Sequence, residues 1–172
     1  VGGYTQLMEG YEDYSNLGNV GIDLYVRPPL PQFPTWKDKM LFRISGEYFP
    51  LQVPEGLSGY EEEIISLTGS VIYRFVGLLG KPEERRWIPY IGGGLGVYWD
   101  RISIDQPAIQ ETSVVANLGF NATGGFQLPT MGNFRLVPEV RAHWIQQPDK
   151  YYTSYISYNL GLVYWLPSRV KE

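Results

Sequence analysis

The second half of the chain alternates apolar and polar residues with a period of two. Within residues 152–166, one face carries side chains such as Ile156 and Leu160, whereas the other carries Asn159 and Gly161. This alternation is typical of β-strands that have one apolar and one polar face. It restricts the fold to a barrel with an apolar core in water or a barrel with an apolar outside in lipid. The position of the charged residues decides between the two.

Turn-forming residues divide the chain into eight strand candidates with no predicted helix between them. The breaks include residues 15–18, the proline-rich residues 28–34 and residues 129–133. A chain of 172 residues is long enough for one domain, so we expect a single all-β domain over residues 1–172: an eight-stranded antiparallel up-and-down transmembrane β-barrel. The predicted strands are 3–10, 19–28, 39–51, 63–76, 87–102, 113–128, 134–146 and 152–166.

Charge falls on one face of these strands. From the second strand onward, the apolar face carries no charged residue within residues 20–26, 40–48, 65–75, 87–99, 114–128, 134–144 and 152–166. A soluble barrel would bury the charged face and expose the apolar one, and both are unfavourable. In a bilayer the pattern is favourable, since a Lys or Arg facing lipid at the midplane costs about 2–4 kcal/mol. The face predicted to line the lumen carries Asp23, Arg27, Arg43, Glu47, Arg74, Asp100, Arg135, Glu139, Arg141 and His143.

An eight-stranded barrel is just wide enough for side chains to fill it. We therefore expect these ions to pair across the lumen as a structural plug. A proton or ion path, or a polar ligand site, is the alternative use of the same residues. An open porin is disfavoured, because such pores need about twice as many strands.

Aromatic residues mark the ends of the apolar faces, as expected for interfacial girdles. Ordinary strand propensity is the alternative explanation for each of them. The predicted interfacial aromatics are Trp87, Trp99, Trp144, Tyr152 and Tyr164.

Composition removes several classes of function. The chain has no cysteine, which excludes disulfides and thiol catalysis, and its net charge of -4 argues against a nucleic-acid partner. The glycine-rich residues 92–96 are not followed by the lysine of a nucleotide loop; we expect them to allow bending and to make room for bulky interior neighbours. Pro138 predicts a local distortion of its strand.

The last strand, which contains Asn159, Gly161, Tyr164 and Leu166, resembles the carboxy-terminal insertion signal of the eight-stranded outer-membrane barrel family typified by OmpA, OmpX and OmpW. The resemblance implies a bacterial outer-membrane protein with periplasmic termini, in contact with lipid and lipopolysaccharide. It implies that the barrel-assembly machinery reads these four residues. A structural or interaction role follows from it, including membership of a larger envelope complex.

Three other classes of barrel protein are alternatives to a structural or interaction role. Outer-membrane lipid A deacylases place a serine two residues after a histidine, but Ile145 occupies that place after His143, the sole histidine, which has inward parity. We therefore expect no catalytic residue, and a single histidine without cysteine predicts no metal site and no cofactor. A small-molecule conduit or binder of the OmpW type is the first alternative function, and a lipid A-modifying outer-membrane enzyme is the second. A soluble lipocalin-type carrier is opposed by the charged interior and by the missing Gly-x-Trp near the first strand.

Overall fold

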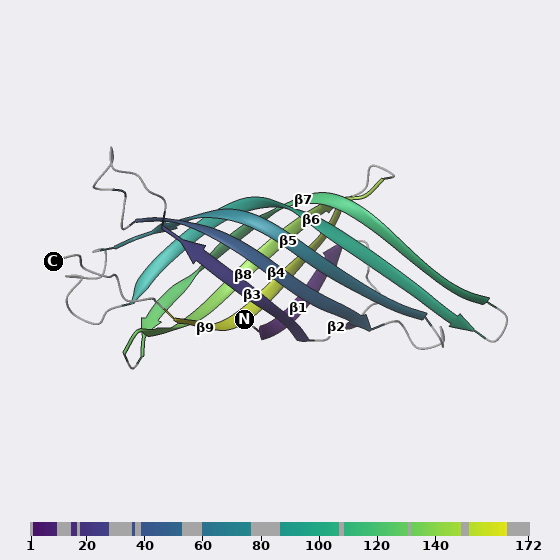
Figure 1. Ribbon diagram of the computed structural model, residues 1–172, viewed down its shortest axis with the longest axis horizontal. Coiled ribbons are helices and arrows are strands. Elements are labelled where there is room, and N and C mark those ends of the chain that lie inside the picture. Colours follow the sequence, from purple (N-terminus) through teal and green to yellow (C-terminus); the bar gives the residue numbers. More distant parts are fainter. Residues whose placement is uncertain are drawn as a thin grey trace.

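Nine β-strands and no other regular element make up the described part of the computed structural model, which covers residues 2–9, 15–16, 18–27, 36, 39–52, 60–76, 87–106, 109–130, 132–148 and 152–164. Figure 1 shows the strands running obliquely along one long axis. Within these residues, no helix has the length and apolarity to cross a membrane. The strands are β1 (Gly2–Glu9), β2 (Ser15–Asn16), β3 (Gly18–Val26), β4 (Met40–Gln52), β5 (Tyr60–Arg74), β6 (Ile88–Gln106), β7 (Ile109–Pro129), β8 (Phe134–Gln146) and β9 (Tyr152–Tyr164).

The strands close into an eight-membered antiparallel ring. Its order is β4-β3-β1-β9-β8-β7-β6-β5, and β5 pairs with β4 again. The two-residue β2 also pairs with β4, beyond the end of β3, so it extends the β3 side of the ring. The eight-stranded antiparallel barrel predicted from the sequence is thus confirmed.

Two predicted boundaries are wrong. The turn expected at residues 15–18 instead contains β2 and the start of β3, because Ser15 and Asn16 join the ladder of β4. The hairpin of β6 and β7 is longer than predicted, since pairing continues to Gln106 and Ile109. It reaches farthest along the long axis at the right of Figure 1.

The two faces of the wall separate apolar from charged side chains as the sequence predicts. On the outer face Ile91, Val140 and Leu160 are exposed. Arg43 and Arg141 on the inner face have exposed fractions of 1% and 0%. A barrel with an apolar core and a charged surface is therefore excluded.

Glycines on the inner side of β6 let neighbouring strands and large interior side chains come close. A Cβ atom added at Gly94 would lie 2.0 Å from the carbonyl oxygen of Gly69. On β7, a Cβ atom added at Gly119 would lie 2.7 Å from the Tyr98 ring, and one added at Gly125 would lie 2.8 Å from the Tyr90 hydroxyl. The glycines thus serve the packing role expected of them.

Pro138 coincides with an interruption of the β7–β8 ladder. Pairing is present at Gly125–Glu139 and resumes at Leu128–Leu136, with the same register on both sides. The β9 side is continuous through Pro138–Leu160. Because proline has no N–H to donate, the predicted distortion takes the form of a local gap in pairing without a register shift.

Candidate functional site

Opposite walls of the barrel meet through an ion pair. Strands β4 and β8 lie diametrically opposite in the ring, with three strands between them on either side. Arg43 Nη1 on β4 nevertheless lies 2.5 Å from Glu139 Oε2 on β8, and both side chains are almost fully buried. The pair therefore bridges the full width of the lumen.

Arg141 is the centre of this cluster. Its Nη1 forms a salt bridge of 2.5 Å with Glu47 Oε1. Its Nη2 donates to Asp23 Oδ2 at 3.1 Å. Its Nε donates to Glu139 Oε1 at 2.8 Å, and its Nη2 also contacts that oxygen. One cation thus joins carboxylates from three strands, β3, β4 and β8. We call Asp23, Arg43, Glu47, Glu139 and Arg141 the ionic cluster.

The alternation of the two strands places these groups together. On β4 every second residue from Arg43 to Glu47 faces inward, and on β8 Glu139, Arg141 and His143 do the same. The Tyr90 hydroxyl on β6 donates to Glu139 Oε2 at 2.6 Å. Buried charges are tolerated when they are paired, and each charged group of this cluster has a counterion.

His143 lies at one end of the ionic cluster in an aromatic pocket. Its Nδ1 forms a hydrogen bond of 2.9 Å with the Tyr98 hydroxyl. Its ring stacks on Tyr155 at 4.3 Å and meets Phe49 edge to face at 5.8 Å. The imidazole is fully buried, so it is packed as an interior side chain and has no access to lipid on the outer face. Across the described ranges, no group of three or more acidic, His or Cys side chains could hold a metal ion.

Apolar layers cover the ionic cluster on both sides along the barrel axis. On one side lie Leu41, Ile72, Tyr90 and Val137. On the other lie Phe49, Leu51, Ile64, Tyr98, Ile145 and Tyr155. These two layers were not predicted, although Leu41 and Phe49 have the same parity as Arg43 in the sequence and could have been found from it. The ions occupy a polar layer between two apolar ones.

The structure does not bring all ten predicted lumen residues together. Arg74 and Asp100 are buried but lie toward opposite ends of the wall, paired with Tyr90 and Ile64 respectively. Arg135 is half-buried at the start of β8. Arg27 is exposed, because β3 ends at Val26 and leaves the next residue beyond the wall. The contacts described above thus join five of the ten predicted residues in the ionic cluster, with His143 beside it.

The predicted aromatic residues lie near two levels of the barrel. Trp87 meets Phe126 at 6.2 Å near one end of the wall, and Trp144 stacks on Phe120 at 4.9 Å toward the other. Trp99 is half-exposed on the second level, and Tyr164 contacts Phe134 on the first at 5.0 Å. The backbone of Tyr152 belongs to β9, but its side chain lies outside the described part.

The residues of the expected carboxy-terminal signal lie on both faces of β9. Asn159 is buried and donates to the Ser157 hydroxyl at 3.0 Å. Gly161 faces inward and Tyr164 is exposed. Leu166 lies outside the described residues.

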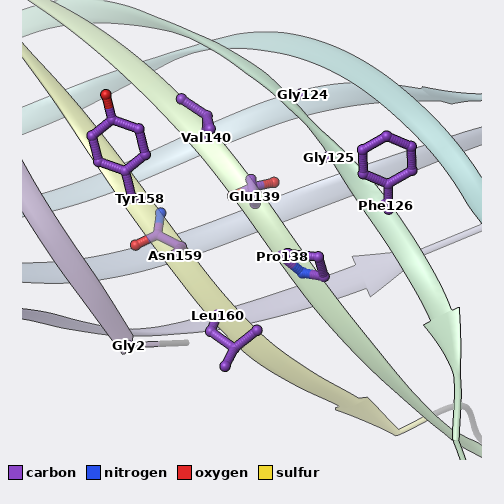
Figure 2. Close-up of a pocket in the computed structure, with 10 residues that line it drawn as sticks. All are labelled: Gly2, Gly124, Gly125, Phe126, Pro138, Glu139, Val140, Tyr158, Asn159 and Leu160. Atoms are coloured by element: carbon purple, nitrogen blue, oxygen red, sulfur yellow. The ribbon is translucent and has the colours of Figure 1, made fainter.

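A shallow groove of about 390 Å³ lies on the apolar outer face of β7, β8 and β9. Figure 2 shows its lining around the ladder interruption, with Leu160 near Pro138 and Tyr158 near Val140. Gly124 contributes no side chain, which leaves the surface hollow there. Glu139 of the ionic cluster and Asn159 also contribute to the lining.

Comparison with known proteins supports the fold. No family model matches the chain, and no curated protein matches it. Among solved structures, the chain is similar to the crystal structure of Neisserial surface protein A (NspA). The match has a TM-score of 0.61 and 14% sequence identity, and it covers 94% of this chain and 90% of that one. At this identity the likeness establishes a shared barrel fold.

Proposed function

We propose that the protein is an integral barrel of the bacterial outer membrane, with a side-chain-filled lumen and a structural or interaction role. The observation that carries the proposal is the inside-out distribution of its side chains. Residues such as Leu95 and Leu118 expose 73% and 68% of their surface, whereas the ionic cluster is buried. Lipid stabilises such an exterior, and the closed ring satisfies the backbone groups that lipid cannot.

The spacing of the aromatic levels matches a bilayer. Trp87 precedes β6 and Trp99 lies within it, twelve residues farther along. For a strand tilted by about 45°, this separation corresponds to about 25–30 Å along the axis. This is close to the height of the apolar band in outer-membrane barrels, about 25 Å. Beyond Trp99 the outer face becomes charged, since Arg101 Nη1 donates to Glu63 Oε1 at 2.9 Å.

The filled interior supports the structural role. The ionic cluster bridges opposite walls, and the apolar layers cover it on both sides. We infer that the lumen conducts no ions and that the protein performs no catalysis. Its proposed partners are outer-membrane lipid and lipopolysaccharide, the barrel-assembly machinery during insertion, and a protein of a larger envelope complex. The termini are proposed to be periplasmic.

A charge placed on the outer face tests the lipid contact. Leu95→Arg is expected to destabilise the vesicle-inserted barrel by about 2–4 kcal/mol, because the guanidinium meets hydrocarbon near the middle of the apolar band. Urea unfolding followed by tryptophan fluorescence measures the change. Val114→Arg is the matched control, since Val114 pairs with Arg101 beyond the band; we expect a change within about 0.5 kcal/mol. Equal effects of the two variants would contradict lipid contact at Leu95.

Ion conductance tests the filled lumen. In planar bilayers the protein is expected to give no stepwise current, because paired side chains and two apolar layers occupy the path along the axis. A sixteen-stranded porin in the same bilayers supplies the positive control. Regular current steps from the purified protein would show that the lumen is open and would refute this part of the proposal.

A further inference from the structure

The hairpin of β6 and β7 leaves a sheet edge open. All of β7 from Ile109 to Leu118 pairs with β6, but pairing with β8 begins only at Gly119–Ile145. Within the described residues, no strand pairs with the other edge of this ten-residue segment, whose length is about 33 Å. Figure 1 shows β7 continuing past β8 toward the right-hand end of the molecule. We call residues 109–118 the β7 edge.

The central part of the β7 edge is exposed and is supported by β6, whereas Asn117 near its end is buried and donates to Gln147 Oε1 at 3.4 Å. All six residues from Glu111 to Ala116 are exposed, including both Val114 and Val115, which belong to opposite faces of the strand. On its paired side β6 is in turn held by β5 as far as Tyr60–Ile104. A three-stranded sheet is therefore available as a template, whereas an isolated two-stranded hairpin would be only marginally stable.

The usual protections of an open edge are missing from this segment. Proteins commonly protect edge strands with lysine, proline or bulges. The β7 edge contains no lysine or proline, Glu111 is its one charged residue, and its register with β6 runs without a bulge. Its central residues from Thr112 to Ala116 have the small and β-branched side chains that favour strand pairing.

We propose that the β7 edge binds an extended, basic segment of another protein by strand addition. In this mode of recognition, main-chain hydrogen bonds provide affinity and alternate side chains provide specificity. Charge selects the partner. Glu61 on β5 and Glu111 on β7 are exposed, whereas Glu62 is buried. Arg101 on β6 is paired with Glu63, so the described part of this surface keeps a net negative charge. A strand that carries lysine or arginine is complementary to this surface.

A second copy of the chain fits the edge less well. Two β7 edges would bring the same acidic residues together. Antiparallel pairing between them would also turn one barrel upside down relative to the other, which two copies inserted in one membrane cannot do. This argument, and the accessibility of the edge outside the bilayer, rest on the proposed membrane function.

The test uses the folded full chain and a ten-residue peptide of alternating valine and lysine. Hydrogen exchange of the backbone amides is measured by NMR, first without peptide and then with it. Without peptide, alternate amides of residues 109–118 are expected to exchange rapidly, because successive N–H groups of a strand point to opposite edges. With peptide, these amides are expected to slow by at least about tenfold. A valine–glutamate peptide and a valine–lysine peptide with alternate N-methyl groups are expected to give no protection.

Two adjacent proline variants provide the matched pair, Val114→Pro and Val115→Pro. One of them removes an N–H from the open edge, as identified by its rapid exchange, and the other removes an N–H from the β6 ladder. The open-edge variant is expected to keep the barrel folded and to reduce peptide binding, measured by fluorescence anisotropy, by at least about tenfold.

Three results would overturn the proposal: slow exchange of the whole edge in the free protein, equal protection by the glutamate peptide, or unchanged binding to the open-edge proline variant. Protection that grows with protein concentration without peptide would instead assign the edge to a second copy. The exchange and binding measurements are made in detergent micelles, so they do not depend on insertion into vesicles. Failure of the protein to insert into vesicles would contradict the proposed membrane function but would leave these measurements valid.

Discussion

Arg141→Met is expected to destabilise the barrel by about 3–5 kcal/mol, the usual effect of breaking a buried ion pair by removing one partner. The loss is large because Arg141 contacts Asp23, Glu47 and Glu139, and the substitution leaves these buried carboxylates without their shared cation. Methionine keeps much of the side-chain volume. Equilibrium unfolding in urea, followed by tryptophan fluorescence in detergent micelles, measures the change.

Arg101→Met is the matched control for that experiment. Arg101 also forms an ion pair, with Glu63, but half of its side chain is exposed. Exposed pairs contribute about 0.2–1 kcal/mol, so we expect the control to lose no more than that. Adding Glu47→Gln to Arg141→Met is expected to recover part of the lost stability, because it removes one uncompensated carboxylate. Similar losses for Arg141→Met and Arg101→Met would show that the ionic cluster does not stabilise the fold.

Gly94→Ala is expected to be the most damaging single-methyl change in the wall. The new Cβ would lie 2.0 Å from the Gly69 carbonyl oxygen and 2.7 Å from Ser70 Cα, both of them backbone atoms that cannot rotate away. Overpacking of this kind typically costs about 1–3 kcal/mol, and contact with backbone places this site at about 3 kcal/mol or above. The folded fraction is measured by the heat-dependent shift in gel mobility of the refolded protein.

Gly69→Ala provides the control, because a Cβ at Gly69 meets no atom within 4 Å. Both positions are strand glycines in directly adjacent parts of the ladder, so replacing either one changes backbone freedom by a similar amount. The difference in folded fraction between the two variants therefore reports the close approach of β5 and β6. Equal refolding yields for the two alanine variants would contradict that close approach.

The sequence predicts the wall of the barrel better than its contents. Period-two alternation is local, so the inward position of Arg43 and the outward position of Leu160 could be predicted from each strand alone. Which groups meet across the lumen depends on the stagger of strands around the ring, which local patterns do not contain. This is why the partnership of Arg43 with Glu139 could not be predicted, and why Arg74 and Asp100 were expected in the same network.

Apolar residues on the charged face were the other source of error. Leu41 and Phe49 lie on the same face of β4 as Arg43 and Glu47, but a prediction that considers only charged residues assigns them no role. Their role follows only when β4 is aligned with β8, where Val137 and Ile145 flank Glu139 and Arg141 in the same sequence of layers. The extension of the β6–β7 hairpin was missed for a related reason, because residues 102–112 mix polar and apolar side chains outside the band that defines the two faces.

The pairing of Arg43 with Glu139 joins segments separated by 96 positions in the chain. Two further pairs join the same halves of the chain, since Asp23 and Glu47 both contact Arg141. The carboxylates of the first half therefore depend on a cation from the second. A sheet that inserted into the bilayer before the barrel closed would expose unpaired charges to the lipid chains. Incompletely folded intermediates are therefore unstable in the membrane, and the barrel must close before it is stably inserted.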